Sequence, residues 1–174
     1  YQFMSDVEFA EQQEQFIIDN SLDLFGKQAR KTKKDGYPDL EIFDNEGRAT
    51  HLIEVKAQRR TFMSVERLLP KANLKPSETV ALNLSDLKRY FEIRRDTKLK
   101  TGLLWVLSDR QCLTNNQSKL IYYQNLDVLE KIYKKYENKR TFRRKSGTGD
   151  IVNGVHKGVV VNYHFSLNEL IKLR

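Results

Sequence analysis

The sequence predicts one α/β domain, in which helices flank a mixed central sheet and a β-hairpin carries the functional residues. Leu, Ile, Val and Phe supply 50 of the 174 residues, about 29%, where disordered chains usually stay below roughly 20%. Strand-like alternation and helix-like spacing follow each other along the chain, which is typical of α/β proteins. The length suits one domain better than two.

The composition indicates which kind of partner the protein binds and in which cellular compartment it lies. The net charge of +8 and the isoelectric point of about 9.5 favour polyanionic partners. The longest apolar run covers residues 103–107, far short of the roughly 20 residues that cross a bilayer, so we expect no membrane association. The single cysteine, Cys112, and the lack of a secretory-signal pattern predict a reducing, cytoplasmic location.

The first predicted element is a helix over residues 5–20. Ser5 and Glu8 have the spacing of a capping box, in which each side chain satisfies a free backbone donor at a helix start. Three apolar side chains then share one face at helical spacing: Phe9, Phe16 and Ile17.

A strand and then a hairpin are predicted next. Residues 22–32 are predicted as a strand, and residues 35–38 have turn chemistry because they combine glycine and proline. Residues 39–44 and 50–58 alternate polar and apolar side chains across a turn at residues 45–47. They therefore predict two antiparallel strands.

The segment over residues 59–79 is polar, and Pro70 and Pro76 argue against a continuous helix there. We expect Ser85 to cap a second helix that reaches about Thr97.

The C-terminal part alternates again. Strands are predicted over residues 102–108, 120–123 and 159–165. A basic helix is predicted over residues 126–139, and the glycine-rich residues 143–158 predict a mobile loop beside a binding surface. Ser166 and Glu169 form a capping box for a short terminal helix. Residues 1–174 thus form one predicted domain, with a core over about 5–108 and an added part over 109–174.

The hairpin places chemistry on an otherwise apolar strand. Side chains alternate along a strand, so Glu54, Lys56 and Gln58 share one face, and Asp39 begins the neighbouring strand. An acid two residues before a lysine also occurs at residues 86/88, 96/98 and 137/139, but those pairs lie on predicted helices or their ends and are interpreted as surface charge. Two carboxylates suit Mg²⁺, and an adjacent ammonium can hold an attacking water.

Pro38-Asp39 followed by Glu54-Val55-Lys56 resembles the PD-(D/E)xK nuclease superfamily, over residues 5 to about 108. The resemblance implies a restriction-endonuclease-like core and a catalytic set of Asp39, Glu54 and Lys56. It further implies that Asp39, Glu54 and the Val55 carbonyl bind Mg²⁺ or Mn²⁺, and that Lys56 assists the water that cleaves the phosphodiester.

Two further positions are candidates for the same site. The resemblance implies an acid on the first helix, and either Glu11 or Glu14 can supply it. Glu14 is preferred because it borders the predicted apolar face, centred near Gln13, whereas Glu11 points nearly opposite. Gln58 matches a position at which some superfamily members carry a polar site residue; the alternative is a polar group at a strand end.

The predicted nucleic-acid contacts are basic residues that follow the hairpin or cluster near the C-terminus. Residues 131–145 hold eight Lys or Arg and one acid, Glu137. The alternative interpretation is a solvated helix face. The predicted contacts are Arg59, Arg60, Lys134, Lys135, Arg140, Arg143, Arg144 and Lys145.

The resulting hypothesis is a Mg²⁺-dependent or Mn²⁺-dependent DNA endonuclease, with a homodimer favoured because two DNA strands need two sites. The alternative is a non-cleaving nucleic-acid-binding or assembly module on the same scaffold. No nucleotide cofactor is expected, because residues 147–154 lack the Gly-Lys-Ser/Thr ending of a phosphate-binding loop.

Overall fold

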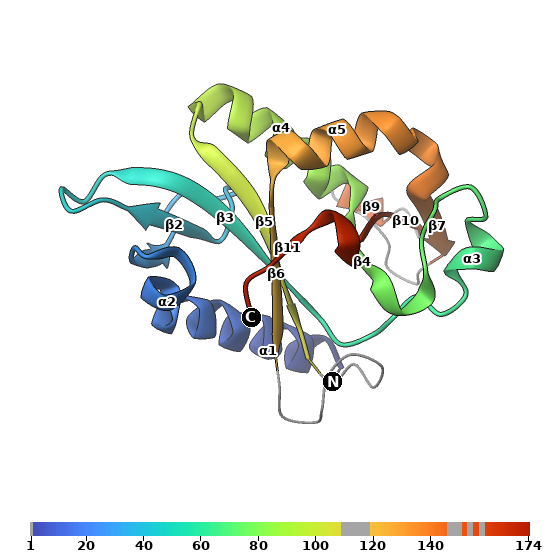
Figure 1. The fold of residues 1–174 in the computed structure, drawn as a ribbon, viewed down its shortest axis with the longest axis horizontal. Helices are drawn as coiled ribbons and strands as arrows, with labels where there is room; N and C mark the ends of the chain where they lie inside the picture. Colours follow the sequence, from blue (N-terminus) through green and yellow to red (C-terminus); the bar gives the residue numbers. More distant parts are fainter. Residues whose placement is uncertain (1, 109–118, 146–150, 153–154, 157–158) are drawn as a thin grey trace.

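The computed structural model describes residues 2–108, 119–145, 151–152, 155–156 and 159–174 (Figure 1). Its main sheet has the strand order β1-β2-β3-β5-β6-β11. The strands are β1 (Ala29–Lys31), β2 (Leu40–Phe43), β3 (Ala49–Gln58), β5 (Lys100–Leu107), β6 (Leu120–Asn125) and β11 (Ile171–Lys172). Strands β3 and β5 pair in parallel and the other neighbours are antiparallel, which confirms the predicted mixed sheet.

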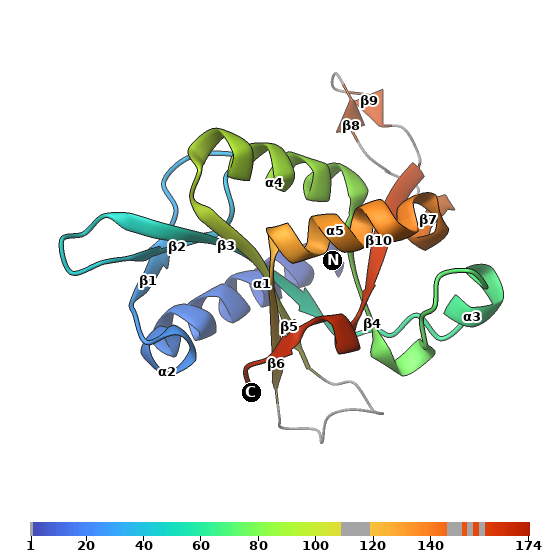
Figure 2. The same ribbon diagram turned by 45° about the horizontal axis from the view of Figure 1, so that its top comes forward.

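Helices cover both faces of this sheet (Figures 1 and 2). The elements on one face are α1 (Gln2–Asp19) and α2 (Ser21–Phe25), and those on the other are α4 (Leu84–Thr97) and α5 (Leu126–Tyr136). The central strand β5 contributes to both cores, because Leu104 packs with Ile17 of α1 while Trp105 packs with Leu87 of α4. The predicted α/β architecture is therefore confirmed.

A second, smaller sheet packs on the α4 side. Its order is β4-β10-β7, with β4 (Thr79–Asn83), β10 (Val159–Ser166) and β7 (Thr141–Lys145) all antiparallel. Phe165 of β10 lies 6.0 Å from Trp105 between ring centroids, so this sheet joins the core of the main one. Strand β4 was not predicted, because its five residues follow Pro76 at the end of a polar segment that resembles a connection.

The remaining elements are short. They are α3 (Val65–Leu68), η1 (Pro76–Glu78), η2 (Glu137–Arg140), η3 (Leu167–Glu169), β8 (Ile151–Val152) and β9 (Val155–His156). Strands β8 and β9 pair with each other and project from the body in Figure 2. Within the described part of the chain, none of the helices combines the length and apolar character that a bilayer crossing requires.

Three local predictions were wrong. Helix α1 begins at Gln2, so Ser5 lies inside it and not at its cap. Residues 22–32 hold α2 and then β1, because Gly26 adopts a left-handed conformation (φ 69°) that ends a short helix. The N-cap of α4 is Asn83, whose side chain accepts a hydrogen bond from the Ser85 backbone N–H at 3.1 Å.

Other predictions were confirmed. The hairpin of β2 and β3 turns at Gly47, whose φ of 77° suits glycine. Residues 59–79 are described throughout and contain no continuous helix; their helical parts are the short α3 and η1. The capping box of Ser166 and Glu169 is present at η3. A fourth prediction, the loop over residues 143–158, was wrong in its described parts: residues 143–145 belong to β7, and β8 pairs with β9. Residues 146–150, 153–154 and 157–158 lie outside the described part.

Candidate active site on the β2–β3 hairpin

The hairpin brings Asp39, Glu54 and Lys56 into one cluster, as the strand pattern predicts. Leu40 pairs with Ile53, so Asp39, one residue before β2, lies opposite Glu54. The Asp39 backbone N–H donates to Glu54 Oε2 at 3.2 Å, and Lys56 Nζ lies 2.6 Å from Glu54 Oε1. Glu54 is only 5% exposed, so its two oxygens are held by the hairpin itself.

The peptide of Val55 completes this edge of the sheet. Its N–H donates to Asp39 Oδ2 at 2.9 Å. In a strand, the N–H and C=O of one residue point to the same edge, so the Val55 carbonyl also points toward Asp39. The geometry thus directs two carboxylates and one carbonyl to a common edge, which is the arrangement that the resemblance implies.

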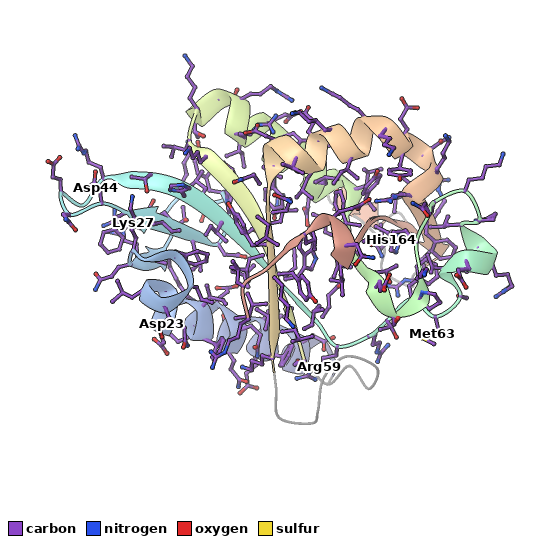
Figure 3. The ribbon with its side chains drawn as sticks, in the orientation of Figure 1. Asp23, Lys27, Asp44, Arg59, Met63 and His164 are labelled. Atoms are coloured by element: carbon purple, nitrogen blue, oxygen red, sulfur yellow. The ribbon has the colours of Figure 1, made fainter. Side chains whose placement is uncertain are left out.

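These groups line a cleft of about 730 Å³ between the first half of α1 and the end of β3. Its walls are formed by Asp6, Phe9, Ala10, Glu14, Asp39 and residues 54–60. The labelled Arg59 in Figure 3 lies beside the N-terminal half of α1, and its guanidinium stacks on the Phe9 ring at 3.5 Å. Arg59 and Arg60 therefore give the mouth of the cleft a positive rim.

Helix α1 turns the preferred acid toward this cleft. Gln13 is 2% exposed and Ile17 is fully buried, which confirms the predicted apolar face. Glu14 lines the cleft beside that face and pairs with Lys31 at 3.6 Å, whereas Glu11 is exposed. Burial, opposed by Lys31, raises the pKa of the Glu14 carboxyl, and the charge of Glu54 adds to the rise.

The cluster carries more negative charge than its cations balance. Burial and the neighbouring charge of Glu54 raise the pKa of Asp39 to about 7, despite the hydrogen bond from Val55. Burial alone would lower the pKa of Lys56, but its ion pair with Glu54 and the nearby Asp86 outweigh burial and raise it. Lys56 therefore keeps its proton, whereas the Asp39 carboxyl is only partly ionised near neutral pH.

A divalent cation would relieve this imbalance. Among the described residues, no three His, Cys, Asp or Glu side chains are grouped as a ready-made metal cage. Mg²⁺, however, commonly uses one or two carboxylates and keeps several waters. Asp39 and Glu54, with the Val55 carbonyl, fit that smaller requirement.

Gln58 lines the cleft, but its amide is engaged with the smaller sheet. Its Nε2 donates to the Ala81 carbonyl at 2.8 Å, and its Oε1 accepts from the Ala81 N–H at 3.3 Å. The side chain thus imitates a paired strand and joins the end of β3 to β4. Its role in the reaction stays a prediction.

The predicted nucleic-acid residues fall into separate groups. Arg59 and Arg60 line the cleft. Lys134 and Lys135 are exposed on α5, where Lys134 lies 3.6 Å from Glu130. Arg143 and Arg144 are exposed on the edge strand β7, and Lys145 ends that strand, with its side chain outside the described part.

Arg140 must be removed from this set. It is fully buried, and its guanidinium donates to both carboxylate oxygens of Glu169 at 2.7 and 2.8 Å and to the Ala72 carbonyl at 2.9 Å. A buried, fully engaged guanidinium has no surface for a phosphate. Its position in a run of basic residues gave no sign of a partner 29 residues away.

Two residues of α4 that the sequence did not assign to the site lie close to Lys56. Asp86 Oδ2 lies 3.8 Å from Lys56 Nζ, and the Tyr90 ring centroid lies 5.8 Å from the same atom. Asp86 was interpreted as surface charge because its spacing to Lys88 is common on helices. Its closeness to Lys56 depends on how α4 packs, for which the sequence carries no local signal.

No protein-family model matches the chain, and no curated protein matches it in sequence. Among solved structures, the chain is similar to Hjc, a Holliday junction resolvase from Archaeoglobus fulgidus, with 8% identity. The match covers 92% of this chain and 87% of that chain, with a TM-score of 0.45. A likeness of this strength carries no weight for function, which rests on the geometry of the cleft.

Proposed function

We propose that this protein is a divalent-metal-dependent DNA endonuclease that hydrolyses phosphodiester bonds. The observation that carries the proposal is the convergence of Asp39, Glu54 and Lys56 in one open cleft. They come from β3 and from the residue just before β2, and are joined by contacts of 2.6 to 3.2 Å through Glu54 and Val55. Charges used only for stability are usually balanced by their partners, and this cluster is not.

The two carboxylates and the Val55 carbonyl would hold Mg²⁺ or Mn²⁺ at the floor of the cleft. When bound, such a cation polarises the phosphodiester and makes water more acidic. Asp39 is suited to this task because its raised pKa reflects negative charge that a cation would stabilise. Glu14, on the α1 wall, would accept a hydrogen bond from water in the cleft.

Lys56 would act on the reacting phosphate. Its ammonium projects from the same face of β3 as Glu54, where it can orient a water molecule and offset the negative charge that builds on the phosphorus. Arg59 and Arg60 at the rim would hold the DNA backbone. Such contacts supply affinity without reading sequence, and cleavage of both strands of a duplex favours a homodimer.

The test is nicking of a supercoiled plasmid with and without Mg²⁺. Lys56→Ala and Asp39→Ala should each lower the nicking rate by about a hundredfold or more, because the first removes the ammonium that offsets the developing charge and the second removes a ligand of the cation. Lys56→Ala should retain DNA binding in a gel-shift assay. Matched controls are Lys88→Ala and Asp23→Ala, which remove the same charges at exposed positions outside the cleft and should leave the rate unchanged.

Undiminished nicking by Lys56→Ala would defeat the catalytic assignment. Wild-type protein that binds DNA but never nicks it, with Mg²⁺ or Mn²⁺, would instead support the alternative, a non-cleaving binding or assembly module. A panel of linear duplex, single strand, four-way junction and RNA, run with wild type and Asp39→Ala, would then define the substrate.

A further inference from the structure

Glu54 is committed to more than one donor at once. Lys56 donates to its Oε1 at 2.6 Å, and the Asp39 backbone N–H donates to its Oε2 at 3.2 Å. A cation that binds Glu54 must compete with these donors, and Lys56 is the charged one. A cation that binds Glu54 Oε1 therefore has to displace the Lys56 ammonium from that oxygen.

Helix α4 offers Lys56 another carboxylate. Asp86, in the first turn of α4, places Oδ2 3.8 Å from Lys56 Nζ, while its Oδ1 is held by Arg89 at 3.2 Å. The Lys56 side chain is 25% exposed and that of Asp86 28% exposed, so the pair is only partly screened by water.

Tyr90 limits where the Lys56 ammonium can go. The ring of Tyr90 is buried one helical turn after Asp86, and Arg89 lies over it at 5.2 Å. Lys56 Nζ therefore lies between Glu54, Asp86 and an aromatic ring. A small rotation of the lysine exchanges one carboxylate for the other without exposing a buried charge.

We propose that Asp86 is a positioning residue for Lys56: its carboxylate holds the ammonium in the cleft when Glu54 binds a divalent cation. The inference rests on the proposed function and extends it. Without Asp86, Lys56 has Glu54 as its one close carboxylate among the described residues and competes more strongly with the cation. Removal of Asp86 should thus weaken cation binding through Lys56, and not merely through the lost charge.

A double-mutant cycle separates these two effects, with Mn²⁺ binding measured by calorimetry in the absence of DNA. Asp86→Asn should weaken Mn²⁺ binding about tenfold when Lys56 is present and less than about twofold in the Lys56→Ala background. Asp86→Glu, which keeps the carboxylate, should restore most of the affinity. Nicking by Asp86→Asn should recover at saturating Mn²⁺, which a general folding defect would not allow.

Asp96→Asn is the matched control, because it makes the same change at an exposed position near the other end of α4. Equal losses of affinity in both Lys56 backgrounds would overturn the inference, since the effect would then be long-range charge alone. Mn²⁺ binding that requires Asp39 but ignores Asp86 would also overturn it, with the proposed function intact. Wild-type protein that binds no Mn²⁺ would overturn both.

Discussion

Two groups of buried charge in this molecule differ in how completely their partners balance them. Arg140 is fully buried and fully satisfied: Glu169 accepts two hydrogen bonds from it, Ala72 accepts a third, and the Tyr136 ring lies 3.6 Å from the guanidinium. The carboxylates at the end of the hairpin instead lie close together with too few cations, and the pKa of Asp39 rises to about 7.

Under the proposed function, this contrast separates the charges that maintain the fold from those that a bound cation would balance. A buried ion pair with hydrogen bonds on every nitrogen can hold distant segments together. Here Arg140 of η2 holds Glu169 of η3 and Ala72, which lies in the segment before η1. An unbalanced cluster lowers the stability of the free protein and is retained where a cation or substrate supplies the missing charge. The two groups should therefore respond to substitution with opposite signs.

The largest effect is expected at the balanced pair. Arg140→Ala should lower the free energy of unfolding by about 3–5 kcal/mol, because it leaves the Glu169 carboxylate without its cation and the Ala72 carbonyl without its donor. Urea denaturation followed by circular dichroism measures it. Lys139→Ala, the exposed neighbour, should change stability by less than about 0.5 kcal/mol. Similar losses in both variants would erase the contrast.

A smaller effect of opposite sign is expected at the cleft. Asp39→Asn keeps an acceptor for the Val55 N–H but removes the charge, so it should raise the free energy of unfolding by about 1–2 kcal/mol in metal-free buffer at about pH 8. The same variant should lose nicking activity. Urea denaturation in the presence of a chelator measures the gain.

The gain should depend on pH. The folded protein holds the Asp39 proton more tightly than the unfolded chain, since the pKa of this carboxyl is about 7 in the fold and 3.8 for an unperturbed aspartate. Wild-type stability relative to Asp39→Asn should thus fall as pH rises from about 4 to about 7 and then level off. A difference that stays constant across this range would show that Asp39 is not strained by its neighbours.

The smallest effect on stability is expected for the exposed arginines of β7. Arg143→Ala and Arg144→Ala on β7 should each weaken DNA binding severalfold, lower the salt dependence of the affinity by about one unit, and leave stability unchanged. Fluorescence anisotropy over a salt series measures this. Lys27→Ala, beside α2 and far from β7 in Figure 3, is the control. If the salt dependence of the affinity is unchanged in these variants, β7 does not contact DNA.

The central part of the site could be predicted because it depends on local pairing. Once residues 39–58 are assigned to a hairpin, the register sets Asp39 opposite Glu54, and alternation sets Lys56 beside Glu54. The acid on α1 follows from helical spacing, which correctly places Gln13 in the core and Glu14 at its border.

The other parts depend on tertiary packing and could not be predicted in this way. Asp86 reaches Lys56 only because α4 lies on that face of the sheet, and Arg140 finds Glu169 only because the chain returns through β10. Short elements were not predicted either. Helix α2, for example, ends at Gly26 after five residues, which are too few to show a helical pattern in the sequence. Nothing in the sequence reveals that β4 pairs with Gln58 and β10.

The side-chain amide of Gln58 couples the end of β3 to the smaller sheet. Its two hydrogen bonds to Ala81, together with the one from the Trp105 indole to the same Ala81 carbonyl at 3.3 Å, fix β4 against the main sheet. Because Gln58 also lines the cleft, a shift of β4 would be transmitted along β3 to the candidate site, so the smaller sheet and the cleft behave as one mechanical unit.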